Sequence, residues 1–363
     1  MVRGCGAGPV SAGLRPFRTG AAVVDRPAAG ILRFRGPQAR WFLDQLLTNR
    51  ILDLPTGSGA DALLLTPKGR ITAVLRLWAS ADEEIIAVLD PGAAAMLAPF
   101  FAGRIFATRV TVEDRSAEVA LVSVLGPRAA DVAGRALVRL GLHSGSGEPP
   151  ALPGGEEHAN VVVPAGDGSI LVARVVRPVP GLDLLVARDR LSGVVEALVS
   201  EGGEVRPTGD LDVASVVEGL PRFGVDFDDR RLPQEAALER AVHFAKGCYL
   251  GQEAVAMAQR GRVKRRLRHL AFEGPPATGS LAHDGLAVGE VTSAAEEDGR
   301  GWGIAMVSTS VAPGSIVEVV EVGDAVGERG PRAEVRDLPG AHEGPRAPSA
   351  RELRERLGGA PRG

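Results

Sequence analysis

A short segment around one cysteine has residue types and spacing that could do chemistry. Cys248 lies in the run Lys-Gly-Cys-Tyr-Leu-Gly-Gln-Glu at 246–253, where the glycines allow tight turns and close approach of a ligand to the backbone. Residues 252–260 are helix formers without a breaker and predict a helix. A helix N-terminus and the ammonium of Lys246 would both favour the thiolate form of Cys248. The thiol is therefore a candidate reactive or cluster-handling group; the alternative is a small buried cysteine that only packs.

The composition is that of a globular protein without strong bulk charge. The 363 residues are 45% hydrophobic and 24% charged, and the formal net charge is -3 at pH 7. This charge gives no overall attraction to nucleic acid or to an anionic membrane. No apolar run is long enough to cross a bilayer, and residues 1–20 lack the apolar core of a secretory signal. Two cysteines do not make a disulfide framework, so a cytoplasmic protein is expected.

The elements that must position the cysteine segment mix strands and helices. Hydrophobic periodicity predicts strands at 31–35, 60–65, 71–78, 84–89, 119–125, 160–163, 169–176 and 183–186. It predicts helices at 38–47, 92–101, 127–141, 191–201 and 213–219, the first with Trp41, Phe42 and Leu46 on its inner face. From residue 263, short alternating strands with turns predict a small antiparallel barrel that ends near residue 322. Residues 1–20 are predicted to be a disordered lead, and residues 323–363 a mostly disordered tail.

Several motifs, in order along the chain, resemble one protein family. The signature at 246–253 is similar to that of the YgfZ family, folate-binding proteins related to the T-protein of the glycine cleavage system. Gln-Leu-Leu-Thr-Asn at 45–49 and Pro-Lys-Gly-Arg at 67–70 resemble the family's N-terminal pattern. Pro-Arg-x-Gly-x-Asp at 221–226 and Pro-Gln-Glu at 233–235 resemble the stretch before the cysteine. Gly-x-Val-Thr-Ser at 289–293 resembles part of the family's barrel.

The resemblance implies an α+β fold with a three-lobed, T-protein-like architecture. Two ferredoxin-like subdomains would form a folate-binding domain over residues 21–262, interleaved and spanning about 21–118 and 119–262. Residues 263–322 would form a C-terminal antiparallel β-barrel. The resemblance also implies a tetrahydrofolate site in the central cavity. The implied role is support of iron–sulfur cluster assembly or repair in client enzymes, including tRNA-modifying ones.

A folate site needs polar groups for the pterin edge and cations for the glutamate tail. Glutamine and glutamate offer the donor and acceptor types that the pterin edge uses, and lysine or arginine could bind carboxylates. Taken alone, the two basic residues of the 67–70 turn are more typical of a solvated hairpin, and Glu253 of a first helical turn. The candidate folate-binding residues are Asn49, Lys68, Arg70, Arg222, Tyr249, Gln252 and Glu253, and the candidate catalytic residues are Cys248, as reactive thiol, and Lys246.

Two departures from the related enzymes bear on function. Many relatives have a glutamate two residues before the glycine that matches Gly219, whereas this chain has Val217 there and Glu218 one position later. The T-proteins have acidic residues on the strand that follows the 67–70 loop, whereas this chain has Ala73 and Val74, which cannot transfer protons. We therefore expect an accessory factor more than an enzyme. An aminomethyltransferase-like enzyme and a pure folate-binding scaffold remain alternatives.

Metal and nucleic-acid readings have weaker support. The six histidines show no pair at ligand spacing, so no metal site is predicted. A single thiolate cannot hold an iron–sulfur cluster within one chain. A basic ribbon could contact RNA or an acidic partner, although a solvated strand is favoured because no aromatic residue is interleaved. Its members are Arg260, Arg262, Lys264, Arg265, Arg266 and Arg268.

Overall fold

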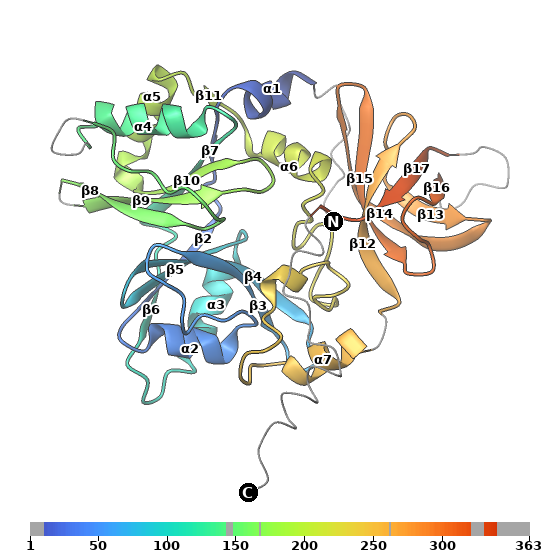
Figure 1. The fold of residues 1–363 in the computed structure, drawn as a ribbon, viewed down its shortest axis with the longest axis horizontal. Coiled ribbons are helices and arrows are strands. Elements are labelled where there is room, and N and C mark those ends of the chain that lie inside the picture. The colour runs from blue at the N-terminus through green and yellow to red at the C-terminus, as the bar shows by residue number, and fades with distance from the viewer. Residues whose placement is uncertain (1–10, 143–147, 167, 261–262, 321–329, 340–363) are drawn as a thin grey trace, which may run out of the picture.

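The computed structural model describes residues 11–142, 148–166, 168–260, 263–320 and 330–339 (Figure 1). A five-stranded antiparallel sheet has the order β3-β4-β5-β2-β6. Its strands are β2 (Gly30–Arg35), β3 (Gly59–Leu65), β4 (Ile71–Ala81), β5 (Glu84–Leu89) and β6 (Thr111–Asp114). Helices α2 (Ala39–Leu46) and α3 (Ala93–Ala102) pack on one face through an apolar cluster that includes Leu75, Phe42 and Phe101. The other face meets a second sheet.

The second sheet has six strands in the order β11-β1-β7-β10-β9-β8. Its strands are β1 (Ala22–Asp25), β7 (Val119–Leu125), β8 (Asn160–Ala165), β9 (Gly168–Val175), β10 (Gly181–Ala187) and β11 (Glu204–Val205). Helices α4 (Ala129–Arg139) and α5 (Leu191–Ser200), the latter preceded by the 3-10 turn η1 (Arg188–Arg190), cover its outer face. Because β1 precedes the whole five-stranded sheet in sequence, the two α+β units are interleaved.

A closed antiparallel barrel completes the fold, at the right of Figure 1. Its strands follow the order β12-β15-β14-β13-β16-β17. They are β12 (Arg265–Phe272), β13 (Gly279–His283), β14 (Leu286–Glu297), β15 (Arg300–Ser308), β16 (Ile316–Val320) and β17 (Arg332–Arg336). The predicted fold class, α+β with a C-terminal antiparallel barrel, is confirmed.

The connecting segment between the second sheet and the barrel lies at the centre of the molecule. It contains α6 (Thr208–Val217), the 3-10 turn η2 (Glu239–Ala241) and α7 (Gln252–Arg260). Its buried side chains share one apolar cluster with residues of both sheets and the barrel, among them Leu63, Val24, Tyr249 and Ile304. This central cluster joins the three parts, so the cysteine segment is anchored where they meet. Within the described residues, no helix is long and apolar enough to span a membrane.

Most predicted elements are confirmed, and the strands at 84–89 and 119–125 and the helix at 252–260 have the predicted bounds. Three predictions are wrong. Residues 11–19 form helix α1 (Ser11–Thr19) rather than a disordered lead, because Leu14 and Phe17 are buried in the central cluster. The barrel does not end near residue 322, since β17 pairs with both β12 and β16. Trp41 is 44% exposed and is not on the inner face of α2. Residues 1–10, 323–329 and 340–363 of the predicted lead and tail lie outside the described part of the chain.

Candidate functional site

The thiol of Cys248 is exposed and unpaired, on a loop that ends where α7 begins. The next residue, Tyr249, is only 7% exposed and belongs to the central cluster. Burial raises the pKa of Tyr249 to about 12, so its hydroxyl stays protonated at neutral pH. The loop therefore holds its tyrosine in the core and presents its cysteine to solvent. The alternative of a cysteine that only packs is not what the structure shows.

Lys246 points into the protein and fastens this loop to the end of α2. Its Nζ donates to the carbonyl oxygens of Asp44 (2.5 Å), Leu47 (2.8 Å) and Asn49 (2.7 Å). The Asp44 carboxylate lies 3.4 Å away, and the ring of Tyr249 is 5.4 Å from Nζ. Burial lowers the pKa of Lys246, partly opposed by Asp44. All three ammonium protons thus have carbonyl acceptors, and Lys246 acts as a clamp that holds the cysteine loop to the end of α2. The predicted effect of Lys246 on the thiolate of Cys248 stays a prediction.

A backbone contact fixes the other side of the loop. Gly251 has φ +82°, and a Cβ at this position would lie 2.5 Å from the carbonyl oxygen of Thr66. A Cβ on Gly69, at φ +72°, would lie 2.8 Å from the Cβ of Ala254 in α7. Only glycine fits where two backbones approach so closely at positive φ. The 67–70 turn and the cysteine segment, far apart in sequence, therefore form one unit.

The predicted folate-binding residues fall into two groups. The side chains of Lys68, Gln252 and Glu253 make no hydrogen bond or ion pair with any residue that the structure describes, and Lys68 and Glu253 are exposed. These three lie on the joined unit of the 67–70 turn and α7. They are the members of the predicted set that could contact a ligand without giving up an internal partner.

The other members are engaged inside the protein. The amide of Asn49 donates to the carbonyl oxygen of Asp61 at 2.7 Å. Arg70 donates to the carbonyl oxygen of Arg230 at 2.6 Å and lies 3.3 Å from the carboxylate of Glu235. Arg222 pairs with Asp212 of α6 at 2.9 Å and donates to the hydroxyl of Ser293 in the barrel at 3.2 Å. Arg222 therefore joins α6 to the barrel, a contact separate from those of the cysteine loop.

Two further motifs are brought together by a buried carboxylate. Asp226 accepts hydrogen bonds from the hydroxyls of Thr292 (2.8 Å) and Ser293 (2.5 Å) and from the backbone N–H of Arg222 (2.8 Å). The motifs at 221–226 and 289–293 are thus the two sides of one joint between the central segment and the barrel. Glu218, the displaced glutamate, pairs with Arg18 of α1 at 2.5 Å.

The strand after the 67–70 turn carries no proton-transfer group at the two positions compared with the T-proteins. Ala73 is 3% exposed and packs under the helices of the first sheet. Val74 points to the opposite face and packs against the central cluster. At these two positions the strand is therefore apolar on both faces.

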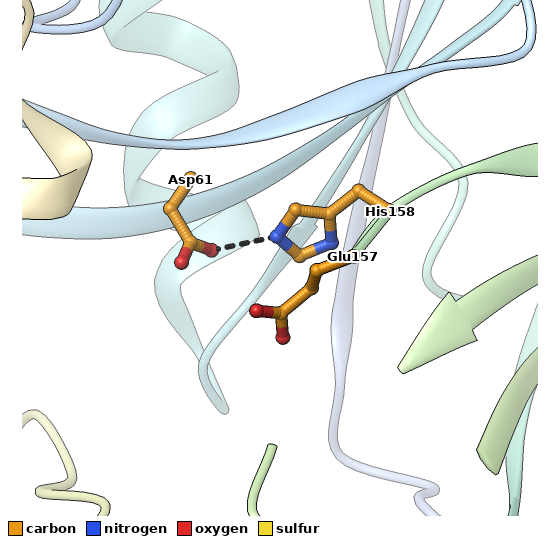
Figure 2. Close-up of side chains that lie close together, drawn as sticks. All are labelled: Asp61, Glu157 and His158. Carbon is orange, nitrogen blue, oxygen red and sulfur yellow. Dashed lines mark hydrogen bonds and ion pairs between the residues drawn. The ribbon is translucent and has the colours of Figure 1, made fainter. Parts of the chain in front are cut away.

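A group that the sequence does not reveal joins the two sheets (Figure 2). Nε2 of His158 lies 3.0 Å from the carboxylate of Asp61 in β3, and Glu157 is close enough for the three to surround a metal ion. Burial would raise the pKa of Asp61, but His158 and then Arg240 outweigh burial and lower it. Asp61 is far in sequence from Glu157 and His158, so no spacing signal could have found the group.

The surroundings of this group do not favour a metal. The indole N–H of Trp78 faces Nδ1 of His158 at 3.4 Å, so Nδ1 is an acceptor and the proton is on Nε2. A histidine bound to a metal through Nε2 would instead donate from Nδ1. Arg240 also lies 3.1 Å from Asp61, and Arg177 lies 2.8 Å from Glu157. Asp61, Glu157 and His158 therefore form a hydrogen-bonded and ion-paired contact between the sheets rather than a metal site.

The basic ribbon keeps little unpaired charge. Arg266 pairs with Glu239 at 2.7 Å, and Arg268 pairs with Asp337. Lys264 and Arg265 are exposed. Arg262 and the side chain of Arg260 lie outside the described part of the chain. The arrangement is closer to a strand with ion pairs than to a continuous cationic surface.

Comparisons with known proteins agree with this architecture. Residues 8–141 match the family model of the GCVT N-terminal domain. A protein of Arabidopsis thaliana named as a chloroplastic transferase is 24% identical over 318 residues, covering 86% of this chain and 71% of the relative. An aminomethyltransferase of Corynebacterium jeikeium is 27% identical over 326 residues, covering 83% of this chain and 84% of the relative.

The crystal structure of the glycine cleavage system aminomethyltransferase T from Bartonella henselae superposes with a TM-score of 0.76 at 21% identity. The match covers 89% of this chain and 87% of that chain. These comparisons bear out the T-protein-like part of the predicted resemblance, and its YgfZ part stays a prediction. The fold is that of the glycine cleavage T-protein.

Proposed function

We propose that this protein binds a folate, tetrahydrofolate first of all, and supports iron–sulfur enzymes through the thiol of Cys248. The single observation that carries the proposal is the exposed sulfur on a loop fixed from both sides. Lys246 holds the loop to the end of α2, and Gly251 holds it against the 67–70 turn. A fixed, accessible thiol is the arrangement expected of a working group, since a cysteine that contributes only packing is buried.

The folate part of the proposal is supported by the T-protein fold and by the free polar side chains around the loop. Lys68 offers a cation for a glutamate tail, and Gln252 and Glu253 offer a donor and acceptors for a pterin edge. Asn49, Arg70, Arg222 and Tyr249 would support the site mainly by holding its segments. The cysteine loop joins the central cluster through Tyr249, so ligand and thiol would share one neighbourhood.

The iron–sulfur part of the proposal is based on the thiol and on the absence of acidic side chains at positions 73 and 74 of β4. One thiolate can bind a cluster only together with ligands from another molecule, so the partner would be a client enzyme, including tRNA-modifying ones. A reducing compartment such as the cytoplasm would keep the sulfur free. Ala73 and Val74 argue against aminomethyl transfer because neither can act as an acid or base.

Aminomethyl transfer is the second candidate, favoured by relatives such as that of Corynebacterium jeikeium, which is named aminomethyltransferase. An assay with the reconstituted glycine cleavage proteins separates the two. Turnover dependent on this chain would support the enzyme, whereas the accessory role predicts none.

The binding experiment is an anaerobic titration with tetrahydrofolate followed by tryptophan fluorescence. Trp302 packs against the central cluster and Trp78 between the sheets, so both can report on a bound ligand. We expect saturation in the low micromolar range. A signal unchanged at millimolar ligand would contradict folate binding. Lys68→Met tests the tail contact, with the surface variant Arg104→Met as its control.

A further inference from the structure

A layer of charged side chains lies between the two sheets. Val74, Arg76 and Trp78 alternate along the face of β4 that meets the second sheet. Val74 packs against the central cluster, and Trp78 belongs to the separate apolar cluster between the sheets. Arg76 therefore lies between two apolar regions. A polar layer in this position borders the centre of the molecule, where the three parts meet.

One carboxylate on the second sheet pairs with Arg76. Asp183 of β10, 1% exposed, lies 2.6 Å from Arg76 and accepts a hydrogen bond from the hydroxyl of Ser123 at 2.5 Å. Ser123 and Asp183 are directly paired across β7 and β10. Burial would raise the pKa of Asp183, but Arg76 and then Arg26 outweigh it and lower the pKa, so the carboxylate stays ionised.

Arg26 lies in the same layer and has no partner among the residues that the structure describes. Val24 is paired with Ser123, and Arg26 follows two residues later, with its backbone N–H bonded to the carbonyl oxygen of Leu121 at 2.9 Å. Within the described part of the chain, the Arg26 guanidinium makes no hydrogen bond and no ion pair. The charges within electrostatic range are those of Arg76, Asp183, Asp90 and Asp212.

The three carboxyl groups near Arg26 do not pair with its guanidinium, and Asp212 pairs with Arg222 instead at 2.9 Å. Burial and then Arg76 lower the pKa of Arg26, but a guanidinium remains charged at neutral pH. Asp183 already has Arg76 and Ser123 as partners. Burial raises the pKa of Asp90, the remaining carboxyl group of the layer, which weakens its ability to neutralise Arg26. Among the residues that the structure describes, the partly buried Arg26 guanidinium therefore has no acceptor of its own, and its N–H groups are available to a ligand.

We propose that Arg26 is a ligand-binding residue whose guanidinium binds a planar oxygen acceptor of the bound ligand. This inference rests on the proposed folate function. The acceptor is either the carbonyl edge of the reduced pterin or a carboxylate of the glutamate tail. Both present the flat oxygen geometry that an arginine fork binds with two parallel hydrogen bonds.

The test measures binding of two probes to three variants. The probes are tetrahydrofolate and 6-methyltetrahydropterin, which has the pterin ring but no glutamate tail. The variants are Arg26→Gln, Arg26→Lys and the control Arg139→Gln, an exposed α4 residue paired with Glu201. Thermal unfolding verifies that each variant is folded, and the charge-conserving Arg26→Lys serves if Arg26→Gln does not fold.

We expect Arg26→Gln to weaken tetrahydrofolate binding roughly 10- to 100-fold, with Arg26→Lys intermediate and Arg139→Gln unchanged. An equal loss with both probes identifies the pterin edge as the acceptor, and a loss with tetrahydrofolate alone identifies the carboxylate. If wild type binds tetrahydrofolate and both Arg26 variants bind it equally well, the inference is overturned while the proposed function stands. If wild type binds no folate, the proposed function and this inference both fall.

Discussion

Gly69 and Gly251 meet backbone to backbone: a Cβ on Gly251 would lie 3.1 Å from the Cα of Gly69. The first glycine is in the turn between β3 and β4, and the second is in the loop that carries Cys248. Both have positive φ, which L side chains rarely adopt. The position of the thiol therefore depends on a contact between the first sheet and the connecting segment.

Gly251→Ala should destabilise the protein and release the cysteine loop. The added methyl group would collide with the carbonyl oxygen of Thr66 and would force alanine into the left-handed region. We expect a loss of about 2–4 kcal/mol in the free energy of unfolding, measured by urea denaturation. Gly247→Ala is the control in the same loop, because a Cβ there meets nothing within 4 Å. Equal stability of the two variants would show that the loop is not held at Gly251.

Lys246→Met should also destabilise, for an electrostatic reason. The ammonium donates to three carbonyl oxygens and faces the carboxylate of Asp44, which would lose its nearest cation. Breaking a buried charge pair in this way costs about 3–5 kcal/mol. The exposed Lys68, changed to Met, is the matched control and should cost little. Similar unfolding curves for the two variants would rule out the clamp.

The sequence predicted elements whose local signals are clear. The strand at 84–89, a continuous apolar run, and the helix at 252–260, a run of helix formers without a breaker, were predicted with the observed bounds. Helix α1 was missed because Leu14 and Phe17 are buried only by residues distant in sequence. Strand β17 was missed for the same reason, since its partners are β12 and β16.

The sequence predicted which segments form the candidate site, but not the contacts that their side chains make. The motifs at 67–70 and 246–253 do come together, but Lys68 is exposed whereas Lys246 is bonded to carbonyl oxygens inside the protein. Sequence proximity placed Lys246 beside the thiol, whereas its long side chain reaches the end of α2. Nothing in the sequence indicates that Asp61 and His158 would meet, or that Arg26 would lack a partner within the described segments. Such pairings depend on how the sheets pack, which no local pattern records.

Because Cys248 is exposed, we expect its replacement to impair function while leaving the stability of the fold nearly unchanged. Cys248→Ala should change the free energy of unfolding by less than about 0.5 kcal/mol, because an exposed side chain contributes little packing. In a Cys5→Ser background, native protein should react fully with iodoacetamide, and the Cys248→Ala variant should not react. In cells, Cys248→Ala should lower the activity of iron–sulfur enzymes. Enzyme activity equal to that with wild type would remove the thiol from the proposed function.

His269 predicts how stability changes at mildly acidic pH. The ring is 5% exposed, stacks on Trp302 with centroids 5.1 Å apart, and donates from Nε2 to the carbonyl oxygen of Val216 at 3.0 Å. Burial lowers its pKa from 6.5 to about 4; the bond to Val216 opposes the shift and Arg336 adds to it. Below pH 6.5 the unfolded chain therefore binds a proton that the folded protein does not bind until about pH 4. The stabilisation that the neutral, buried His269 contributes is fully present above pH 6.5. It is lost as the pH falls toward 4, by about 3 kcal/mol in total.

His269→Gln should remove that dependence, because the amide can still donate to the Val216 carbonyl but does not titrate. The measurement is urea unfolding of wild type and variant at pH 7 and pH 5. Because the other histidines contribute equally to both proteins, the difference between them isolates His269. Wild type should lose about 2 kcal/mol more than the variant between the two pH values. Parallel pH profiles would mean that the pKa of His269 is the same in the folded protein as in the unfolded chain, and that its burial does not govern stability at acidic pH.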